Sequence, residues 1–361
     1  MIGSAHANAL AAAIDLVVGG ASLSADQTSD AFDVIMRGEG TNAQIRALFV
    51  ALAAKGETAQ EVAGGVRALR KAMLPFDTME AATLVDTCGT GGGAFSTFNI
   101  STAAALVAAG AGVRIAKHGN RSHSSRCGSA DVLEALGVDI QPSREVMQRM
   151  LDHAGIVFMF APAMHPAMRH VAAVRRELGV QTIMNFLGPL ANPASAGRQV
   201  VGVANPARME LMAGALAELG SVHALVVHGE PGMDEISPIG CTRVLEVRSG
   251  TVREWSIDPA DYGLMTTAED LAGGEPAENA ARVIAVLEGS DKGGARSAVV
   301  LNAAAAIYVS EFGMYVSERG VFEPGTEAES FTEAIRCAID SIDSRAALRA
   351  LTALREASVG G

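Results

Sequence analysis

The sequence predicts an α/β protein, with a small all-helical domain followed by a large domain built on a central, mostly parallel β-sheet. Before Pro75 the chain shows only helical patterns, whereas after it short β-branched runs alternate with Ala-rich helical segments. That alternation is typical of parallel sheets, because parallel strands need long crossover connections. With 49% hydrophobic and 19% charged residues, the chain has the composition of a packed globular protein.

The helical part contains two capping-box patterns, Thr41 with Gln44 and Thr58 with Glu61, which predict helix N-termini. Apolar residues then recur on one helix face: Ile45, Leu48, Phe49 and Leu52, and later Val62, Val66, Leu69 and Met73. Pro75 is expected to end the last of these helices. Because no obvious chemistry accompanies these stripes, we expect a packing or dimerisation module.

In the second part, four short runs are the predicted strands: Leu84–Val85, Val113–Ile115, Val200–Val203 and Leu225–Val227. The apolar run 102–112 is only half of the roughly 20 residues that a membrane span needs, so it predicts a buried helix. Residues 165–193 are again helical in pattern, with breaks at Gly188-Pro189 and Asn192-Pro193. The predicted domains are residues 1–75 with about 165–193, and residues 80–160 with 196–361.

Composition also indicates where in the cell the protein is located and which partners it does not bind. A formal net charge of −12 argues against a general nucleic-acid-binding surface. The four cysteines are widely spaced and form no C-x-x-C pair, which argues against a zinc site or a disulfide framework. Asp15 interrupts the first apolar run, so we expect a helix there and not a signal peptide. These features predict a cytoplasmic protein that binds neither nucleic acid nor membranes.

The first candidate motif is Asp86-Thr87-Cys88-Gly89-Thr90-Gly91-Gly92-Gly93, with four glycines in five positions after a predicted strand. Glycine allows positive φ and lets backbone N–H groups approach a ligand closely. Such a nest of N–H groups suits a phosphate or pyrophosphate. The segment matches neither the G-x-x-x-x-G-K-[ST] nor the G-x-G-x-x-G pattern. By itself it is therefore equally compatible with a flexible turn.

The second motif, Asn99-Ile100-Ser101-Thr102, opens the apolar helix. Its amide and hydroxyl groups could simply cap that helix. Following a glycine-rich loop so closely, they also suit phosphate oxygens or a metal.

The third motif, Lys117-His118-Gly119-Asn120-Arg121, follows a predicted strand, and Ser122, Ser124, Ser125, Arg126, Gly128 and Ser129 come after it. The carboxyl ends of strands are where open α/β sheets bind ligands. Lysine and arginine supply charge for a phosphate, and the hydroxyls supply hydrogen bonds. The alternative is a solvated basic loop.

The fourth motif, His228-Gly229-Glu230-Pro231-Gly232-Met233-Asp234-Glu235, follows another predicted strand. Its two adjacent carboxylates can reach one or two Mg²⁺ ions. Adjacent acids are also common on protein surfaces. A pyrophosphate substrate, which needs a divalent metal, would favour the first interpretation.

Together, these segments resemble the anthranilate phosphoribosyltransferase family. The resemblance runs from about Thr41 to Val247 and rests on the order and spacing of Thr41–Gly56, the glycine-rich loop, Asn99–Thr102, Lys117–Gly137, His165–Pro193 and His228–Ser237. It implies a homodimer formed through the small helical domains. It also implies transfer of ribose 5-phosphate from phosphoribosyl pyrophosphate to the amine of anthranilate, with release of pyrophosphate, in L-tryptophan biosynthesis.

The resemblance implies a role for each matching residue. Those expected to bind phosphoribosyl pyrophosphate are Gly89, Thr90, Gly91, Gly92, Thr97, Asn99, Ser101, Thr102, Lys117 and Ser129. Those expected to line the anthranilate path are Gly89, His118, Asn120, His165 and Arg175, with Arg175 meeting the carboxylate. Asp234 and Glu235, helped by Ser101, are expected to hold about two Mg²⁺ ions that enter with the pyrophosphate substrate. Lys117 and Arg175 are the expected catalytic residues.

Two positions depart from the family pattern. Gly93-Ala94 stands where the family usually has Asp-Gly, so a carboxylate near the metal is missing. Arg126-Cys127 replaces a more usual Lys-Ser pair, which is a milder change.

Two other functions remain as alternatives. A pyrimidine nucleoside phosphorylase, which resembles this family in fold, would need no metal pair, so Asp234, Glu235 and Arg175 argue against it. A non-catalytic nucleic-acid-binding relative should show a basic groove, which the net charge of −12 disfavours.

Overall fold

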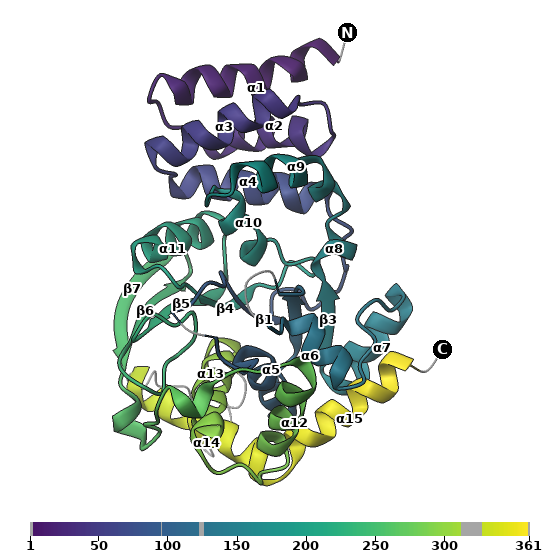
Figure 1. Ribbon diagram of the computed structural model, residues 1–361, viewed down its shortest axis with the longest axis vertical. Helices are drawn as coiled ribbons and strands as arrows, with labels where there is room; N and C mark the ends of the chain where they lie inside the picture. The colour runs from purple at the N-terminus through teal and green to yellow at the C-terminus, as the bar shows by residue number, and fades with distance from the viewer. Residues whose placement is uncertain (1–2, 95, 123–125, 312–326, 360–361) are drawn as a thin grey trace.

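The computed structural model describes residues 3–94, 96–122, 126–311 and 327–359, with helices at one end and an α/β domain at the other (Figure 1). Ser124 and Ser125, which belong to the third motif, lie outside the described residues. Among the described residues, no helix has the length and apolar character needed to cross a membrane.

The helical end begins with α1 (Gly3–Val18), α2 (Ala25–Met36), α3 (Asn42–Lys55) and α4 (Ala59–Ala72). Both predicted capping boxes are present, at the starts of α3 and α4. A third box, formed by Ser24 and Gln27 at the start of α2, was not predicted. The predicted apolar stripes of α3 and α4 are buried, and α4 ends before Pro75.

A later segment joins this helical end through α8 (Ala161–Met164), α9 (Arg169–Leu178) and α10 (Met184–Leu190), with α9 packed on α3 and α10 on α4 (Figure 1). The predicted break at Gly188-Pro189 is wrong, because α10 continues through Pro189 to Leu190. Proline is tolerated there because it lies in the last turn of a short helix. Its carbonyl accepts hydrogen bonds from the Gln199 amide and the Cys88 thiol.

The α/β domain is built on a sheet that, in the described residues, has the strand order β3-β2-β1-β4-β5-β6-β7. Its strands are β1 (Val85–Gly89), β2 (Ile115–Gly119), β3 (Ile156–Phe160), β4 (Arg198–Gly202), β5 (His223–Gly229), β6 (Thr242–Arg248) and β7 (Thr251–Ile257). The pairs from β3 to β5 are parallel, and β6 and β7 are antiparallel, which confirms a mostly parallel sheet. The chain order reverses between β1 and β4, so a ligand crevice is expected at their carboxyl ends.

Helices cover both faces of the sheet, because the strands bury side chains alternately on each side. Val200 and Leu225 face one core with α5 (Ile100–Gly110), α7 (Arg144–Ala154), α13 (Gly294–Ser310), α14 (Glu327–Asp343) and α15 (Ala346–Val359). Val201 and Val226 face the other core, which α11 (Met209–Glu218) shares with the helical end. The two ends of the molecule are therefore joined by a continuous core.

Three of the four predicted strands are too short at their carboxyl ends, and the fourth, Val200–Val203, runs one residue past the end of β4. Lys117 and His118 were placed after a strand, but they lie within β2 and are buried. Asp86 and Gly89 likewise belong to β1, and His228 belongs to β5. The motifs therefore begin inside the sheet, which holds their first residues rigidly.

Candidate active site

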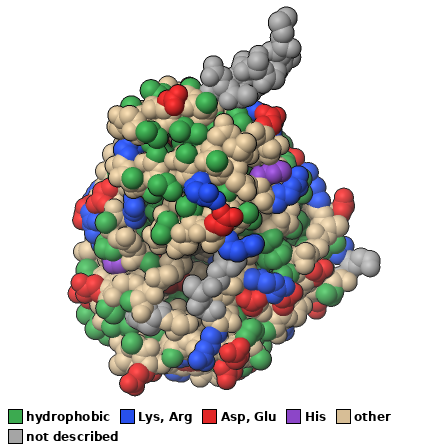
Figure 2. Space-filling model, turned by 45° about the horizontal axis from the view of Figure 1, so that its top comes forward, with side chains coloured by type: hydrophobic (Ala, Val, Ile, Leu, Met, Phe, Trp, Pro, Cys, Tyr) green, Lys and Arg blue, Asp and Glu red, His purple; other side chains and the backbone are tan. Residues whose placement is uncertain are grey.

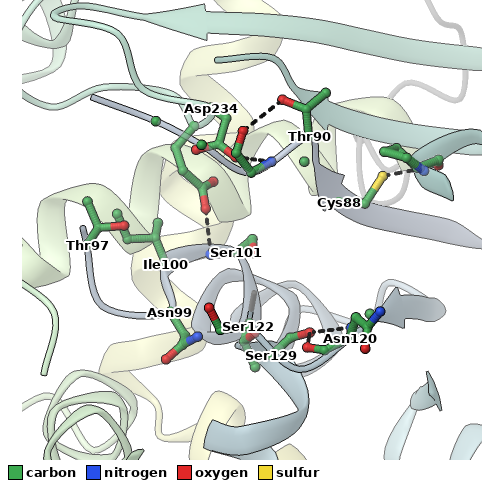
Figure 3. A pocket seen from close by; sticks show the side chains of 18 of the residues that line it. Cys88, Thr90, Thr97, Asn99, Ile100, Ser101, Asn120, Ser122, Ser129 and Asp234 are labelled. Atoms are coloured by element: carbon green, nitrogen blue, oxygen red, sulfur yellow. Dashed lines mark hydrogen bonds between the residues drawn. The ribbon is translucent and has the colours of Figure 1, made fainter. Parts of the chain in front are cut away.

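A cavity of about 690 Å³ lies at the carboxyl end of the parallel strands. It brings together most of the predicted site residues: Gly89, Thr90, Gly91, Gly92, Thr97, Asn99, Ser101, Thr102, Lys117, His118, Asn120, Ser129, Asp234 and Glu235. Figure 3 shows Asp234 and Ser101 on one side and Asn120, Ser122 and Ser129 on another. This position is the sheet's reversal point, as the strand order predicts.

The glycine-rich loop forms one wall. Gly91 and Gly92 have φ angles of 69° and 81°, which favour glycine. A Cβ on Gly89 would lie 2.9 Å from Asp234 Oδ2, so that glycine allows the carboxylate to approach β1. Asp234 Oδ2 in turn accepts a hydrogen bond from the Gly91 N–H at 2.9 Å. The loop is therefore an ordered part of the site and not merely a turn.

The acidic pair is half-buried in the wall of the cavity and does not lie on an open surface. Burial raises the pKa of Asp234. Burial, and then the charge of Asp234, also raise the pKa of Glu235. Two carboxylates that are costly to ionise next to each other create a strong preference for a cation between or beside them.

Lys117 stands next to this pair at the end of β2. Its Nζ donates hydrogen bonds to Thr87 O at 2.6 Å and Thr87 Oγ1 at 3.2 Å, and lies 3.4 Å from Ser101 Oγ. Burial lowers the pKa of Lys117, whereas the charges of Asp86 and Glu235 oppose that effect. The side chain is 3% exposed, so the interpretation as a solvated basic loop fails for this residue.

Arg121, by contrast, pairs with Asp131 at 2.7 Å and also with Glu134. Its pKa is raised by these hydrogen bonds. The Arg121 guanidinium, which the sequence suggested for a phosphate, is therefore already paired with two carboxylates of the protein.

The start of α5 is not capped by Asn99, whose side chain makes no capping hydrogen bond. Instead Asn99 Nδ2 donates to Cys127 O at 3.1 Å, and Asn99 Oδ1 accepts from Asn279 Nδ2 at 3.0 Å. The Thr102 hydroxyl is buried and has no hydrogen-bond partner among the described residues. The capping interpretation of this motif is therefore wrong for Asn99.

Ser129 closes the opposite wall. Its Oγ accepts a hydrogen bond from Asn120 N and donates one to Asn120 O, both at 3.2 Å. A Cβ on Gly119 would lie 2.2 Å from Ser129 Oγ, so this close approach requires glycine. Asn120 and Ser129 thus form one rigid unit facing the cavity.

His118 and His165 form a buried ring pair whose centroids are 5.0 Å apart. Burial lowers the pKa of His118 to about 3 and that of His165 to about 4, so both rings are neutral at pH 7. His118 Nε2 and both ring nitrogens of His165 have no side-chain partner in the described structure. A pair of neutral rings next to the cavity suits an aromatic ligand better than a second anion.

Arg175 and His165 are the two predicted site residues that do not line this cavity. Arg175 lies in the last turn of α9, half-buried, with its pKa lowered by burial. Its guanidinium has no ion pair within the described part of the chain. It is thus a partly desolvated cation without a counter-charge.

The cavity offers few side chains that could bind a metal ion. Among the described residues, no group of three or more His, Cys, Asp or Glu side chains could hold an ion. Two carboxylates nevertheless fit Mg²⁺, which is usually bound by one or two carboxylates together with substrate phosphates. The residues present fit a metal that shares its coordination with a pyrophosphate.

Sequence reasoning missed three buried polar residues that support the site: Asp86, Asn279 and Asn302. Asp86 Oδ1 accepts a hydrogen bond from His118 N at 3.1 Å. Asp86 belongs to the glycine-rich motif, so its position offered a signal. Asn279 and Asn302 lie in helical segments far along the chain and offered none.

Comparison with known proteins shows which family has this two-part architecture. Residues 81–318 match the model of the glycosyl transferase family a/b domain, and residues 11–73 match that of the glycosyl transferase family helical bundle domain. The chain is thus a two-part glycosyl transferase of that class.

Its relatives narrow the class further. The chain is 49% identical over 352 residues to anthranilate phosphoribosyltransferase of Herpetosiphon aurantiacus, covering 96% of this chain and 98% of that protein. The solved structure from Thermus thermophilus is 40% identical with a TM-score of 0.86, covering 96% and 99%. The Saccharomyces cerevisiae enzyme in complex with PRPP and Mg is 27% identical with a TM-score of 0.82, covering 97% of each chain. The chain belongs to the anthranilate phosphoribosyltransferase family.

Proposed function

We propose that this protein transfers the 5-phosphoribosyl group of phosphoribosyl pyrophosphate to the amine of anthranilate, giving N-(5-phosphoribosyl)anthranilate and pyrophosphate. The observation that carries the proposal is the grouping of the glycine-rich loop, Lys117 and the pair Asp234 and Glu235 around one cavity. Membership of the family supports the same activity. The yeast relative has been solved with 4-fluoroanthranilate, which supports an anthranilate-like acceptor.

The donor is proposed to lie along the glycine-rich loop and the start of α5. Backbone N–H groups of the loop and the N-terminus of α5 offer positive dipole ends to its phosphate oxygens. The buried hydroxyl of Thr102 has no partner in the described part of the chain, and Thr102 lines the cavity. Ser129 would hold the other side of the donor, and Asn120, which is hydrogen-bonded to Ser129, would face the acceptor.

Asp234 and Glu235 are proposed to hold Mg²⁺ that enters with the donor, about two ions in all. When bound, the metal neutralises the charge that builds on the departing pyrophosphate. Lys117 contributes a further positive charge from the end of β2, held by Thr87. Its neighbours Asp86 and Glu235 help to keep it protonated.

The reaction itself needs little proton transfer before the chemical step, because the aromatic amine of anthranilate is neutral at pH 7. Its nitrogen forms a bond to C1 of the ribose, while the bond from C1 to the pyrophosphate oxygen breaks and its electron pair leaves with pyrophosphate. The amine then releases one proton. Catalysis would rest on positioning and on electrostatic stabilisation of the leaving group.

The acceptor is proposed to approach past the neutral rings of His118 and His165, with Arg175 binding its carboxylate. A guanidinium that has no counter-charge and is partly desolvated is well suited to pair with a carboxylate. Because Arg175 lies on the helical end and Lys117 on the sheet, the two substrates would be held by opposite parts of the molecule.

The proposed assembly is a homodimer formed through the helical end, in the cytoplasm. Exposed apolar side chains on that end include Leu16 and Val18 of α1, Val50 of α3, and Val180. Figure 2, in which this end comes forward, shows many hydrophobic side chains on it. The four cysteines are free thiols, which supports a reducing compartment.

The activity can be tested by following the fluorescence of anthranilate after mixing it with protein, Mg²⁺ and phosphoribosyl pyrophosphate. The signal should fall only when all four components are present, and a chelator should stop the reaction. A protein that instead cleaved a pyrimidine nucleoside with inorganic phosphate, without metal, would contradict the proposal.

A further inference from the structure

The backbone hydrogen bonds within the loop that carries the acidic pair lie before the pair, between Gly229, Gly232 and Met233. After β5 the chain forms an irregular loop, closed by an isolated bridge between Gly229 and Met233. Ile236, immediately after the pair, is completely buried. Buried backbone N–H and C=O groups outside regular structure must find partners elsewhere.

The partner of Ile236 is a single side chain on α13. Asn302 Oδ1 accepts a hydrogen bond from Ile236 N at 2.9 Å, and Asn302 Nδ2 donates one to Ile236 O at 2.9 Å. Nδ2 also donates to Ala298 O at 2.9 Å, within its own helix. An asparagine amide has the donor and acceptor pattern of a peptide group, so Asn302 pairs with Ile236 as a neighbouring strand would.

We infer that Asn302 is a positioning residue that fixes the carboxylate of Glu235 for metal binding. The inference rests on the proposed role of Glu235 as a metal ligand. It goes further by assigning the rigidity of that ligand to a residue 66 positions away in the chain.

The geometry explains how this positioning works. The Ile236 N–H belongs to the peptide group that joins Glu235 to Ile236, so holding it sets the direction in which the Glu235 side chain leaves the backbone. At its other end, Glu235 Oε1 accepts a hydrogen bond from Ser101 N at 3.2 Å. Glu235 is thus held at its backbone by a residue of α13 and at its carboxylate by a residue of α5.

Position and burial agree with this role. Asn302 is 3% exposed and, together with Glu235 and Ser101, lines a small space of about 10 Å³ beneath the acidic pair. Asn302 does not line the main cavity, so it does not touch the substrates. Removing a group that orients a metal ligand through a hydrogen bond typically weakens metal affinity or activity by about 10- to 100-fold.

The test compares Asn302→Leu, which keeps the size and removes all three hydrogen bonds, with Asn302→Asp, which keeps the acceptor for Ile236 N–H and loses the donor. A matched control is Val299→Ala, a buried change on the same helix that leaves Asn302 and its three hydrogen-bonding groups in place. Thermal unfolding of each variant shows how much stability it has lost. If Asn302→Leu fails to fold, Asn302→Ala, which removes the same three hydrogen bonds with a smaller side chain, takes its place in the test.

Two readouts are needed. Calorimetric titration of Mg²⁺ into protein preloaded with phosphoribosyl pyrophosphate, without anthranilate, measures metal affinity directly. Amide hydrogen exchange at Ile236 measures the hydrogen bond independently of metal. We expect Asn302→Leu to weaken Mg²⁺ binding by roughly 10-fold or more, to speed exchange at Ile236, and to leave the KM for anthranilate nearly unchanged. Asn302→Asp, which keeps the acceptor for the Ile236 N–H, should keep exchange at Ile236 slow and lose less Mg²⁺ affinity than Asn302→Leu.

Glu235→Gln, measured in parallel, separates the two ideas. If Glu235→Gln leaves Mg²⁺ affinity unchanged, the proposed metal role of Glu235 is wrong. If Glu235→Gln weakens Mg²⁺ binding but the Asn302 variants behave like Val299→Ala, then Asn302 is only a packing residue and the inference is overturned.

Discussion

Glu235 Oε1 accepts a hydrogen bond from the backbone N–H of Ser101 at 3.2 Å, so a carboxylate of the loop that follows β5 lies at the N-terminus of α5. The positive end of the helix dipole favours that carboxylate, whereas the nearby charge of Asp234 disfavours it. The same helix start faces the cavity, so a pyrophosphate would approach both the helix end and the acidic pair. Metal ions between these groups would remove the repulsion.

The first prediction concerns that pair. Changing Asp234→Asn together with Glu235→Gln removes both anionic ligands while keeping their shape. We expect activity to fall by at least about 100-fold and the Mg²⁺ concentration at half-maximal rate to rise. The control is Glu288→Gln, which changes an exposed glutamate that does not line the cavity. Full activity of the double variant at ordinary Mg²⁺ would show that the pair is not a metal site.

The second prediction concerns pH. Because burial raises the pKa values of both Asp234 and Glu235, part of the pair is protonated near neutral pH and must lose that proton when Mg²⁺ binds. Apparent Mg²⁺ affinity should therefore weaken as pH falls, by up to about tenfold per pH unit for each proton released.

This proton release can be counted by titrating Mg²⁺ into the donor-loaded protein in two buffers that differ in ionisation enthalpy. The same titration of the donor alone gives the background, and Glu235→Gln should release fewer protons than the unmodified protein. An affinity that does not vary between pH 6 and 8 would mean that both carboxylates are already ionised.

The third prediction concerns Arg175. A charge-assisted hydrogen bond contributes about 1.5–3 kcal/mol, so Arg175→Ala should raise the KM for anthranilate roughly 10- to 100-fold. The KM for phosphoribosyl pyrophosphate should change far less. Arg176→Ala, an exposed neighbour on α9, should leave both values nearly unchanged. An unaltered KM for anthranilate in a folded Arg175→Ala protein would remove Arg175 from the acceptor site.

The sequence carried enough information for most of the site but not for its supports. Lys117, Asp234 and Glu235 occur in local motifs at strand ends, and parallel strands bring such ends to one edge. Asn279 and Asn302 lie in α12 (Pro276–Leu287) and α13, and they reach Asn99 and Ile236 across 180 and 66 positions. A single amide in an apolar helix has no periodic signal, so its role appears only when the fold is known.

The type and the ends of some strands could not be predicted from the sequence either. The run Ile156–Phe160, which forms β3, is wholly apolar, and periodicity cannot separate such a buried strand from a buried helix. Lys117 and His118 were expected beyond their strand because they are polar. Within β2, Lys117 Nζ finds a partner in Thr87 O, and the backbone N–H of His118 finds one in Asp86 Oδ1, both on the neighbouring β1.

The fourth prediction concerns assembly. The exposed apolar residues Leu16, Val18 and Val50 on α1 and α3 would be covered in a homodimer. Light scattering at micromolar concentration should give about twice the 37.1 kDa of the chain. Val18→Glu with Val50→Glu should shift the mass towards the monomer. A mass of 37.1 kDa for the unmodified protein would contradict the prediction.

The last prediction concerns Gly93, which replaces the usual aspartate of the family. A Cβ at this position would lie 3.0 Å from Asp234 Oδ1 and 3.4 Å from Gly232 O, so a new carboxylate would stand beside the acidic pair. The φ angle of Gly93 lies outside the left-handed region, so the backbone itself does not forbid aspartate. Without that third charge, we expect Mg²⁺ to bind weakly to the substrate-free protein and to enter mainly with the donor.

Gly93→Asp should therefore tighten Mg²⁺ binding to the substrate-free protein, because a third carboxylate gains more from a divalent cation than it loses by repulsion from Asp234. Gly93→Asn, which has the same size without the charge, separates this electrostatic gain from the steric contact of 3.0 Å. Calorimetric titration of Mg²⁺ into all three proteins, with and without phosphoribosyl pyrophosphate, measures the difference. Tight Mg²⁺ binding by the unmodified, substrate-free protein would contradict this prediction, because another residue would then already supply the missing carboxylate.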